Sequence, residues 1–161
     1  MEARIEPAGV ADAGEILTLQ RAGYVGEAQL YGDPFLPPLV ESLAQIRAAI
    51  ENTASGGDIV LKACLHGRVV GAARAKQVGR TGSVFRLVVA PDVQGRGIGT
   101  ALLRAVEEAF RGRVEELVLF TGDRSDGSLR LCRRFGYTEI RRERIAPHRG
   151  LVHMRKPLAD P

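Results

Sequence analysis

The sequence has little of what builds disulfide frameworks, metal centres or aromatic stacking surfaces. It contains two cysteines, three histidines and no tryptophan in 161 residues, and aromatic residues make up 5% of the chain. The spacing of Cys64 and Cys132 fits no zinc pattern, so we expect two reduced thiols and no metal site. No apolar run reaches the roughly 18 residues that a membrane-spanning helix needs.

Lysine is also scarce, occurring only at positions 62, 76 and 156, yet arginine brings the net charge to +4. This basic balance fits either an ordinary solvated surface or attraction of a polyanion, such as nucleic acid or a phosphate-bearing cofactor. No nucleic-acid recognition motif accompanies the charge, so we expect no nucleic-acid partner. Because no long apolar run is present, we expect no membrane partner either. The N-terminus lacks the apolar core of a signal peptide, which makes the cytosol the expected compartment.

What is present is an alternation of helical and strand patterns along the whole chain. Apolar residues at helical spacing predict helices at about 11–30, 42–52, 97–111 and 128–135. Alternating or β-branched segments predict strands at about 3–6, 58–65, 68–75, 83–89, 117–120, 137–144 and 151–156. Segments 34–38 and 123–127 are predicted to be irregular. Because no linker divides the sequence, residues 1–161 are predicted to form a single α/β domain around one sheet.

The most informative segment runs from Gln94 to Thr100 and joins a predicted buried strand to a strong helix. The start of a helix exposes unpaired backbone N–H groups and partial positive charge, which suit a phosphate. Gly95, Gly97 and Gly99 let the backbone approach such a ligand closely. The segment lacks the lysine of a nucleotide-hydrolysing phosphate loop, and its glycine spacing differs from the dinucleotide fingerprint. A glycine-rich turn without any ligand is the plainer interpretation.

Two motifs resemble those of the GNAT superfamily of N-acetyltransferases. Gln94-x-x-Gly97-x-Gly99 resembles the Q/R-x-x-G-x-G/A motif that binds pyrophosphate in that family. The preceding segment from Leu87 to Pro91 resembles the family's fourth strand. The stretch from Ser128 to Tyr137 is similar to its N-x-x-L-Y-x-x-x-G-F/Y motif, with Ser128 and Cys132 in place of the asparagine and the first tyrosine. These motifs lie within residues 84–137, while the predicted order of elements is similar from end to end.

The resemblance implies an α+β fold and a cosubstrate. The expected fold is a single α/β domain with a mixed, mostly antiparallel sheet of about seven strands, splayed between strands four and five and flanked by about four helices. The expected cosubstrate is acetyl-CoA, and the acceptor would be a small-molecule or protein amine. The resemblance also allows a homodimer. The residues expected to bind the cofactor are Leu87, Val88, Val89, Gln94, Gly95, Arg96, Gly97, Ile98, Gly99, Thr100 and Ser128.

Acetyl transfer to an amine requires a base, a polarised carbonyl and a protonated leaving thiol. Because Cys132 replaces the tyrosine that usually serves as acid, we consider three alternatives: the Cys132 thiol itself, another donor such as Tyr137, Tyr31 or water, or a purely structural Cys132. Glu27 is the candidate base. The candidate acceptor residues are Tyr24, Glu27, Tyr31 and Asp33, although these residues would also fit an ordinary helix end with surface charge.

The sequence therefore favours an N-acetyltransferase in which the amine attacks acetyl-CoA directly within a ternary complex. The alternative is a non-catalytic acyl-CoA-binding or regulatory domain, which the missing tyrosine and the absence of a carboxylate from the strand at 83–89 would explain.

Overall fold

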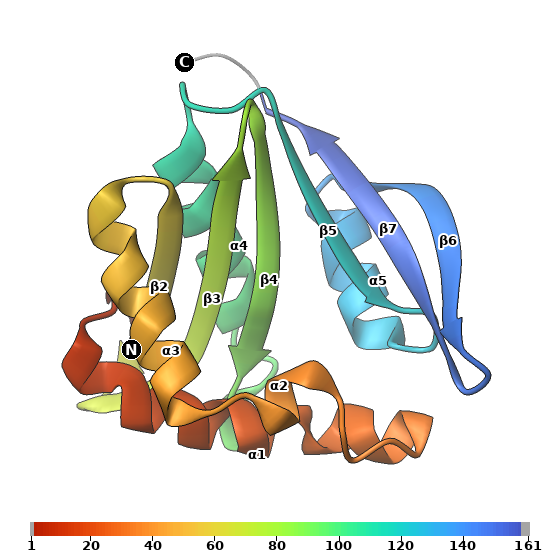
Figure 1. Cartoon of the computed structure of the whole chain (residues 1–161), viewed down its shortest axis with the longest axis horizontal. Coiled ribbons are helices and arrows are strands. Elements are labelled where there is room, and N and C mark those ends of the chain that lie inside the picture. Colours follow the sequence, from red (N-terminus) through yellow and green to blue (C-terminus); the bar gives the residue numbers. More distant parts are fainter. Residues whose placement is uncertain (1, 159–161) are drawn as a thin grey trace.

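A seven-stranded sheet forms the centre of the structure, which is a computed structural model that describes residues 2–158 (Figure 1). The strands are β1 (Arg4–Pro7), β2 (Asp58–Leu65), β3 (Arg68–Val78), β4 (Thr81–Val89), β5 (Glu116–Gly122), β6 (Thr138–Ala146) and β7 (Arg149–Pro157). The helices are α1 (Ala13–Tyr31), α2 (Pro37–Val40), α3 (Leu43–Glu51), α4 (Ile98–Phe110) and α5 (Asp126–Arg134), with short 3₁₀ turns at Val10–Asp12, Asn52–Ser55 and Pro91–Val93.

The strand order across the sheet is β1-β2-β3-β4-β5-β7-β6, and only the β4–β5 pair is parallel. This arrangement confirms the predicted mixed, mostly antiparallel sheet. Local sequence explains the hairpins: His66 and Gly67 both take positive φ values, 52° and 74°, between β2 and β3. Two such residues are what the tight hairpin turn with the correct twist requires.

Helices cover both faces of the sheet. In the view of Figure 1, α1 and α3 lie in front of the sheet and α4 lies behind it. The amphipathic pattern predicted α4 correctly, because Leu102, Leu103, Val106 and Phe110 are fully buried against the strands. None of the helices in residues 2–158 is long and apolar enough to cross a membrane.

The parallel pair β4–β5 is short, and this feature creates the site. The two strands pair only at Thr81↔Glu116, Gly82↔Leu117 and Ser83↔Val118. Beyond these pairs the strands separate, and Figure 1 shows them diverging from one end. The splay predicted between strands four and five is therefore confirmed.

Several predicted boundaries were wrong. Residues 37 and 38 were predicted to be irregular but begin α2, because the prolines at its first two positions preset helical φ and need no N–H partner there. Helix α5 begins at Asp126 rather than Ser128, since the carbonyl of Ser125 already accepts from the N–H of Leu129. The strands predicted at 68–75 and 83–89 are longer than predicted, because β3 and β4 pair as far as Val78↔Thr81.

Candidate active site

A cavity of about 860 Å³ opens where β4 and β5 separate. Its size falls in the range of small-molecule sites. Its walls come from the second half of α1, the segment around α2, β4, the turn before α4, β5 and α5. The lining residues include Tyr24, Glu27, Tyr31, Phe85, Arg86, Leu87, Val88, Val89, Gln94, Gly95, Gly97, Ile98, Gly99, Thr100, Phe120, Thr121, Arg124, Ser125, Ser128, Arg130, Leu131, Cys132, Arg134 and Arg149.

The turn before α4 forms one end of this cavity. Gly95 and Gly97 both have φ near 80°, a left-handed conformation that glycine adopts without steric cost. Gly97 is the N-cap of α4 and offers no side chain to the first N–H groups of the helix. These amides are therefore available to an anion. Arg96, which the motif suggested as a ligand residue, lies on the exposed side of the turn and does not line the cavity.

Strand β4 carries a bulge beside the cavity. Ala72 pairs with Val88 and Arg74 with Phe85, so both Arg86 and Leu87 face Ala73. Such an insertion bends the strand and turns a side chain to a new direction. The carbonyl of Leu87 accepts a hydrogen bond from the Tyr24 hydroxyl at 3.2 Å. This contact ties α1 to the bulge.

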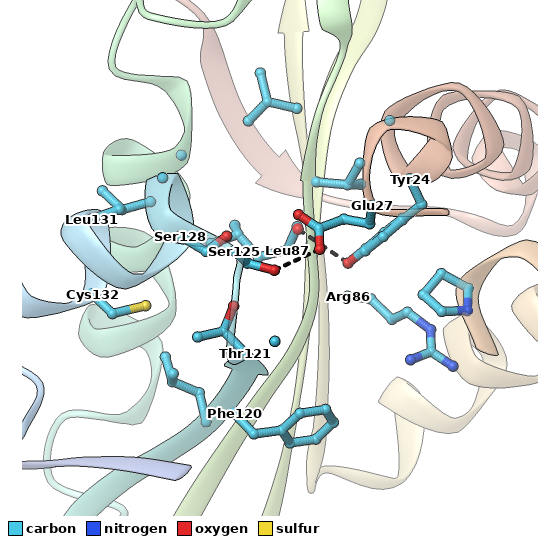
Figure 2. Close-up of a pocket in the computed structure, with 18 of the residues that line it drawn as sticks. Tyr24, Glu27, Arg86, Leu87, Phe120, Thr121, Ser125, Ser128, Leu131 and Cys132 are labelled. Carbon is cyan, nitrogen blue, oxygen red and sulfur yellow. Dashed lines mark hydrogen bonds between the residues drawn. The ribbon is translucent and has the colours of Figure 1, made fainter. Parts of the chain in front are cut away.

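A chain of hydroxyl groups orients Glu27 within the cavity, and Figure 2 shows its last bond, between Ser125 and Glu27. The Ser125 hydroxyl donates to Oε2 of Glu27 at 2.6 Å, and Ser125 Oγ lies 2.8 Å from the Tyr31 hydroxyl. Because the single proton of Ser125 goes to Glu27, Tyr31 must be the donor to Ser125. The Tyr31 oxygen in turn accepts from the backbone N–H of Arg124 at 2.8 Å. Each donor in this chain has a single acceptor, so Oε2 of Glu27 is held in a defined position.

The two candidate acids occupy different places. Cys132 lines the cavity but is only 4% exposed, and burial raises the pKa of its thiol to about 11. Tyr137 is 2% exposed and does not line the cavity, and its buried hydroxyl has no hydrogen-bond partner among the described residues. Burial also raises the pKa of Tyr137, with Glu107 adding to the shift. Neither group is placed as a proton donor of ordinary acidity.

Of the four candidate acceptor residues, three lie in the cavity and one does not. Tyr24, Glu27 and Tyr31 line it, whereas Asp33 borders a shallow hollow on the outer side of α1. Its Oδ2 lies 2.9 Å from Nε2 of His148, in the turn between β6 and β7. The Asp33 carboxylate thus joins two loops instead of lining the cavity.

The sequence did not single out Ser125 or Arg86. Ser125 lay in a segment that was predicted to be an irregular loop, and its contact with Glu27 spans 98 positions of the chain. Arg86 lay in a predicted strand, where the bulge left no local signal. Among the described residues, no group of three or more His, Cys, Asp or Glu side chains is arranged to hold a metal ion.

This chain belongs to the acetyltransferase (GNAT) family, whose model matches residues 26–137. It is 34% identical over 157 residues to a mycothiol acetyltransferase of Geodermatophilus obscurus, an alignment that covers 97% of this chain and 44% of that protein. It is 29% identical over 96 residues to "Acetyltransferase plu1384" of Photorhabdus laumondii, covering 59% of this chain and 67% of that one. The chain therefore spans less than half of the first of these relatives.

Solved structures share the fold. The PaiA N-acetyltransferase of Thermoplasma acidophilum, determined in complex with coenzyme A, superposes with a TM-score of 0.80 at 16% identity. The superposition covers 98% of this chain and 99% of that one. At this identity the likeness concerns the fold alone.

Proposed function

We propose that this protein is an N-acetyltransferase that moves the acetyl group of acetyl-CoA to a small-molecule or protein amine. The observation that carries the proposal is the oriented Glu27 carboxylate, which faces a cavity bounded at one end by the free amides of α4. Membership of the acetyltransferase family and the coenzyme A complex of a structural relative support it.

The residues present fit acetyl-CoA. The turn amides from Gly95 to Thr100 would receive the pyrophosphate, and the unpaired edge of β4 at Leu87, Val88 and Val89 would pair with the amides of the pantetheine arm. Ser128 lines the opposite wall and can donate or accept a hydrogen bond. Arg130 and Arg134 on α5 add positive charge for phosphate groups.

The reaction requires an amine that has lost a proton. An alkyl ammonium has a pKa near ~10.4, so only about one molecule in a thousand is neutral at pH 7. Glu27 attracts the ammonium and accepts its proton directly or through one water. The amine nitrogen then forms a bond to the acetyl carbon, after which the carbon–sulfur bond breaks, coenzyme A leaves as a thiolate and the nitrogen gives up its second proton. A backbone N–H of Val88 or Val89 would stabilise the oxyanion between these steps.

We propose that the second proton of the attacking nitrogen, which must leave before the amide is formed, passes through a water molecule to the leaving thiolate. A thiol with a pKa of about 11 is a weaker acid than an ordinary thiol, so transfer of a proton from Cys132 to the coenzyme A thiolate would run uphill. Tyr24 lines the same cavity, but burial raises its pKa to about 12, and its proton is engaged by Leu87. Cys132 is therefore proposed to fill space beside the cofactor.

The second candidate is a domain that binds acyl-CoA without transferring the acyl group. The specific observation in its favour is the lack of an ordinary acid: Cys132 has a raised pKa, and Tyr137 lies outside the cavity. Glu27 favours the enzyme over this alternative, because a binding domain has no need for a carboxylate held by a directed hydroxyl chain.

The test is an acceptor panel assayed with acetyl-CoA for release of free thiol, with a Cys132→Ala variant in parallel. The panel contains small amines, amino acids, aminoglycosides and peptides with free N-termini. We expect turnover with at least one class, and a variant rate within about threefold of the parent. Acetyl-CoA binding without turnover by any acceptor would favour the binding domain, and absence of acetyl-CoA binding in calorimetry would refute both. The homodimer stays a prediction for light scattering.

A further inference from the structure

Arg86 has a backbone conformation that a non-glycine residue rarely adopts. Its φ is 53°, in the left-handed region, and it occupies the bulge of β4. Left-handed backbone costs a side-chain-bearing residue energy and persists only where the surrounding structure enforces it, most often at functional sites. Here Arg86 is one of the residues that line the cavity.

The charges around Arg86 do not balance. Arg74 and Arg86 share a single carboxylate, Glu41, and the three side chains are only 6%, 20% and 14% exposed. Glu41 is bonded to Arg74 through both of its oxygens and accepts a further bond from Gln20. Burial opposes ionisation of Glu41, but the bonds from Arg74 and Gln20 outweigh it and lower its pKa, so the carboxylate is charged.

Arg86 is left with the surplus charge. Its Nε lies 3.5 Å from Oε1 of Glu41, yet this buried nitrogen makes no hydrogen bond to any described residue. Two guanidinium groups and one carboxylate leave a net charge of +1 in a mostly buried cluster. A surplus charge in such a place is stabilised only by the solvent that reaches the cavity or by an anion that pairs with it there.

Arg86 is the member of this cluster that lines the cavity, and Glu27 lines the same cavity. Figure 2 shows Tyr24 and Arg86 on one side of β4, with Ser128, Leu131 and Cys132 on the other side. The cofactor is proposed to contact the side that carries Ser128, which leaves the side of Arg86 to the acceptor. Outside α5, the other cationic residues that line the cavity are Arg124 and Arg149. Among the described lining residues outside α5, only Glu27 carries a carboxylate.

From this arrangement we infer that the acceptor is an amine that also carries a carboxylate, held by the guanidinium of Arg86 while its ammonium faces Glu27. The inference rests on the proposed function, since it assigns the acceptor class of the same site. Arginine suits this role because its planar fork binds a carboxylate through two parallel hydrogen bonds. The acceptor class is thus an amino acid with the free acid intact, and a peptide N-terminus without a nearby carboxylate is disfavoured.

The experiment compares amino acids with their carboxamides. Small α-, β- and γ-amino acids and the matching carboxamides are titrated into protein saturated with coenzyme A, and kcat/KM is measured with acetyl-CoA. We expect at least one free acid to bind and react about 30-fold better than its amide. In Arg86→Gln this ratio should fall to about threefold or less. Arg80→Gln, which removes an exposed arginine paired with Glu115, should leave the ratio unchanged.

A second variant guards against misfolding. Arg86→Gly removes the guanidinium and accepts a positive φ without strain, so it should fold and bind acetyl-CoA while losing the same discrimination. Equal or better use of the carboxamides by the parent protein would overturn the inference, as would the absence of binding by every amino acid. If acetyl-CoA itself does not bind, both the proposed function and the inference are refuted. If acetyl-CoA binds and other amines are acetylated, only the inference fails.

Discussion

Glu27 shows how a single residue depends on contacts that are remote in sequence. We expect Glu27→Gln to lower kcat about 100-fold, because the amide keeps the shape of the carboxylate but cannot take the proton of the amine. Ser125→Ala should lower kcat about tenfold with a smaller change in the KM for acetyl-CoA, since Glu27 loses the bond that orients it. Steady-state kinetics with the best acceptor of the panel measures both. Glu51→Gln, the same change on the exposed end of α3, is the control. A kcat for Glu27→Gln equal to that of the control would remove Glu27 from the mechanism.

Residues on one helix could be placed together from sequence, and residues on different elements could not. Tyr24, Glu27 and Tyr31 share α1 at helical spacing, so grouping them required only the period of the helix. Their partners Ser125 and Leu87 come from distant segments, and no local pattern announces such contacts. Tyr137 shows a limit of motif-based inference. Its position in the motif gave its sequence neighbours but not the direction of its side chain.

Helix α1 packs closely against strand β4 at Gly23, because this residue has no side chain. A Cβ at this position would overlap the Cγ2 atom of Val88. We expect Gly23→Ala to displace α1 from β4, break the bond between Tyr24 and Leu87, and destabilise the fold by about 1–3 kcal/mol. Gly26→Ala is the matched control, because nothing lies near its added Cβ, and it should stabilise the helix by about 0.5–1 kcal/mol. Urea unfolding and kcat/KM report the two effects. Equal stability changes in the two variants would contradict this view of the interface.

Elements with a regular spacing of apolar residues or a clear turn signal were predicted well, and features that depend on tertiary contacts were not. The stripe of α4 and the hairpin β2–β3 carry their own signals in residues such as Leu102 and Gly67. The first turn of α5 follows from the contact between Ser125 and the α1 network, and the bulge at Arg86 follows from register with β3. Neither the first turn of α5 nor the bulge could be predicted from the local sequence pattern.

The whole molecule should lose stability at alkaline pH. Burial raises the pKa of Cys132 from 9.0 to about 11 and that of Tyr24 from 10.0 to about 12, and it also raises that of Tyr137. Above about pH 9 the unfolded chain releases these protons while the folded protein retains them, so the free energy of unfolding falls as pH rises. Cys132 alone should account for roughly 1 kcal/mol at about pH 10. Urea unfolding between about pH 8 and pH 10 measures the loss, and Cys132→Ala should reduce it. An identical pH dependence in that variant would show that the thiol ionises normally.

The short pairing between β4 and β5 also bears on the resistance of the protein to aggregation. Beyond Ser83 and Val118, each strand pairs on its outer side only, so two unpaired edges face one another inside the molecule. Unpaired strand edges on a protein surface invite other chains and aggregation. These edges lie within the walls formed by α1, α5 and the turn before α4, while the outer strand β6 carries the charges of Arg141, Arg142 and Arg144. The unpaired backbone of β4 and β5 thus lies inside the molecule, where it is shielded from the edge strands of other chains.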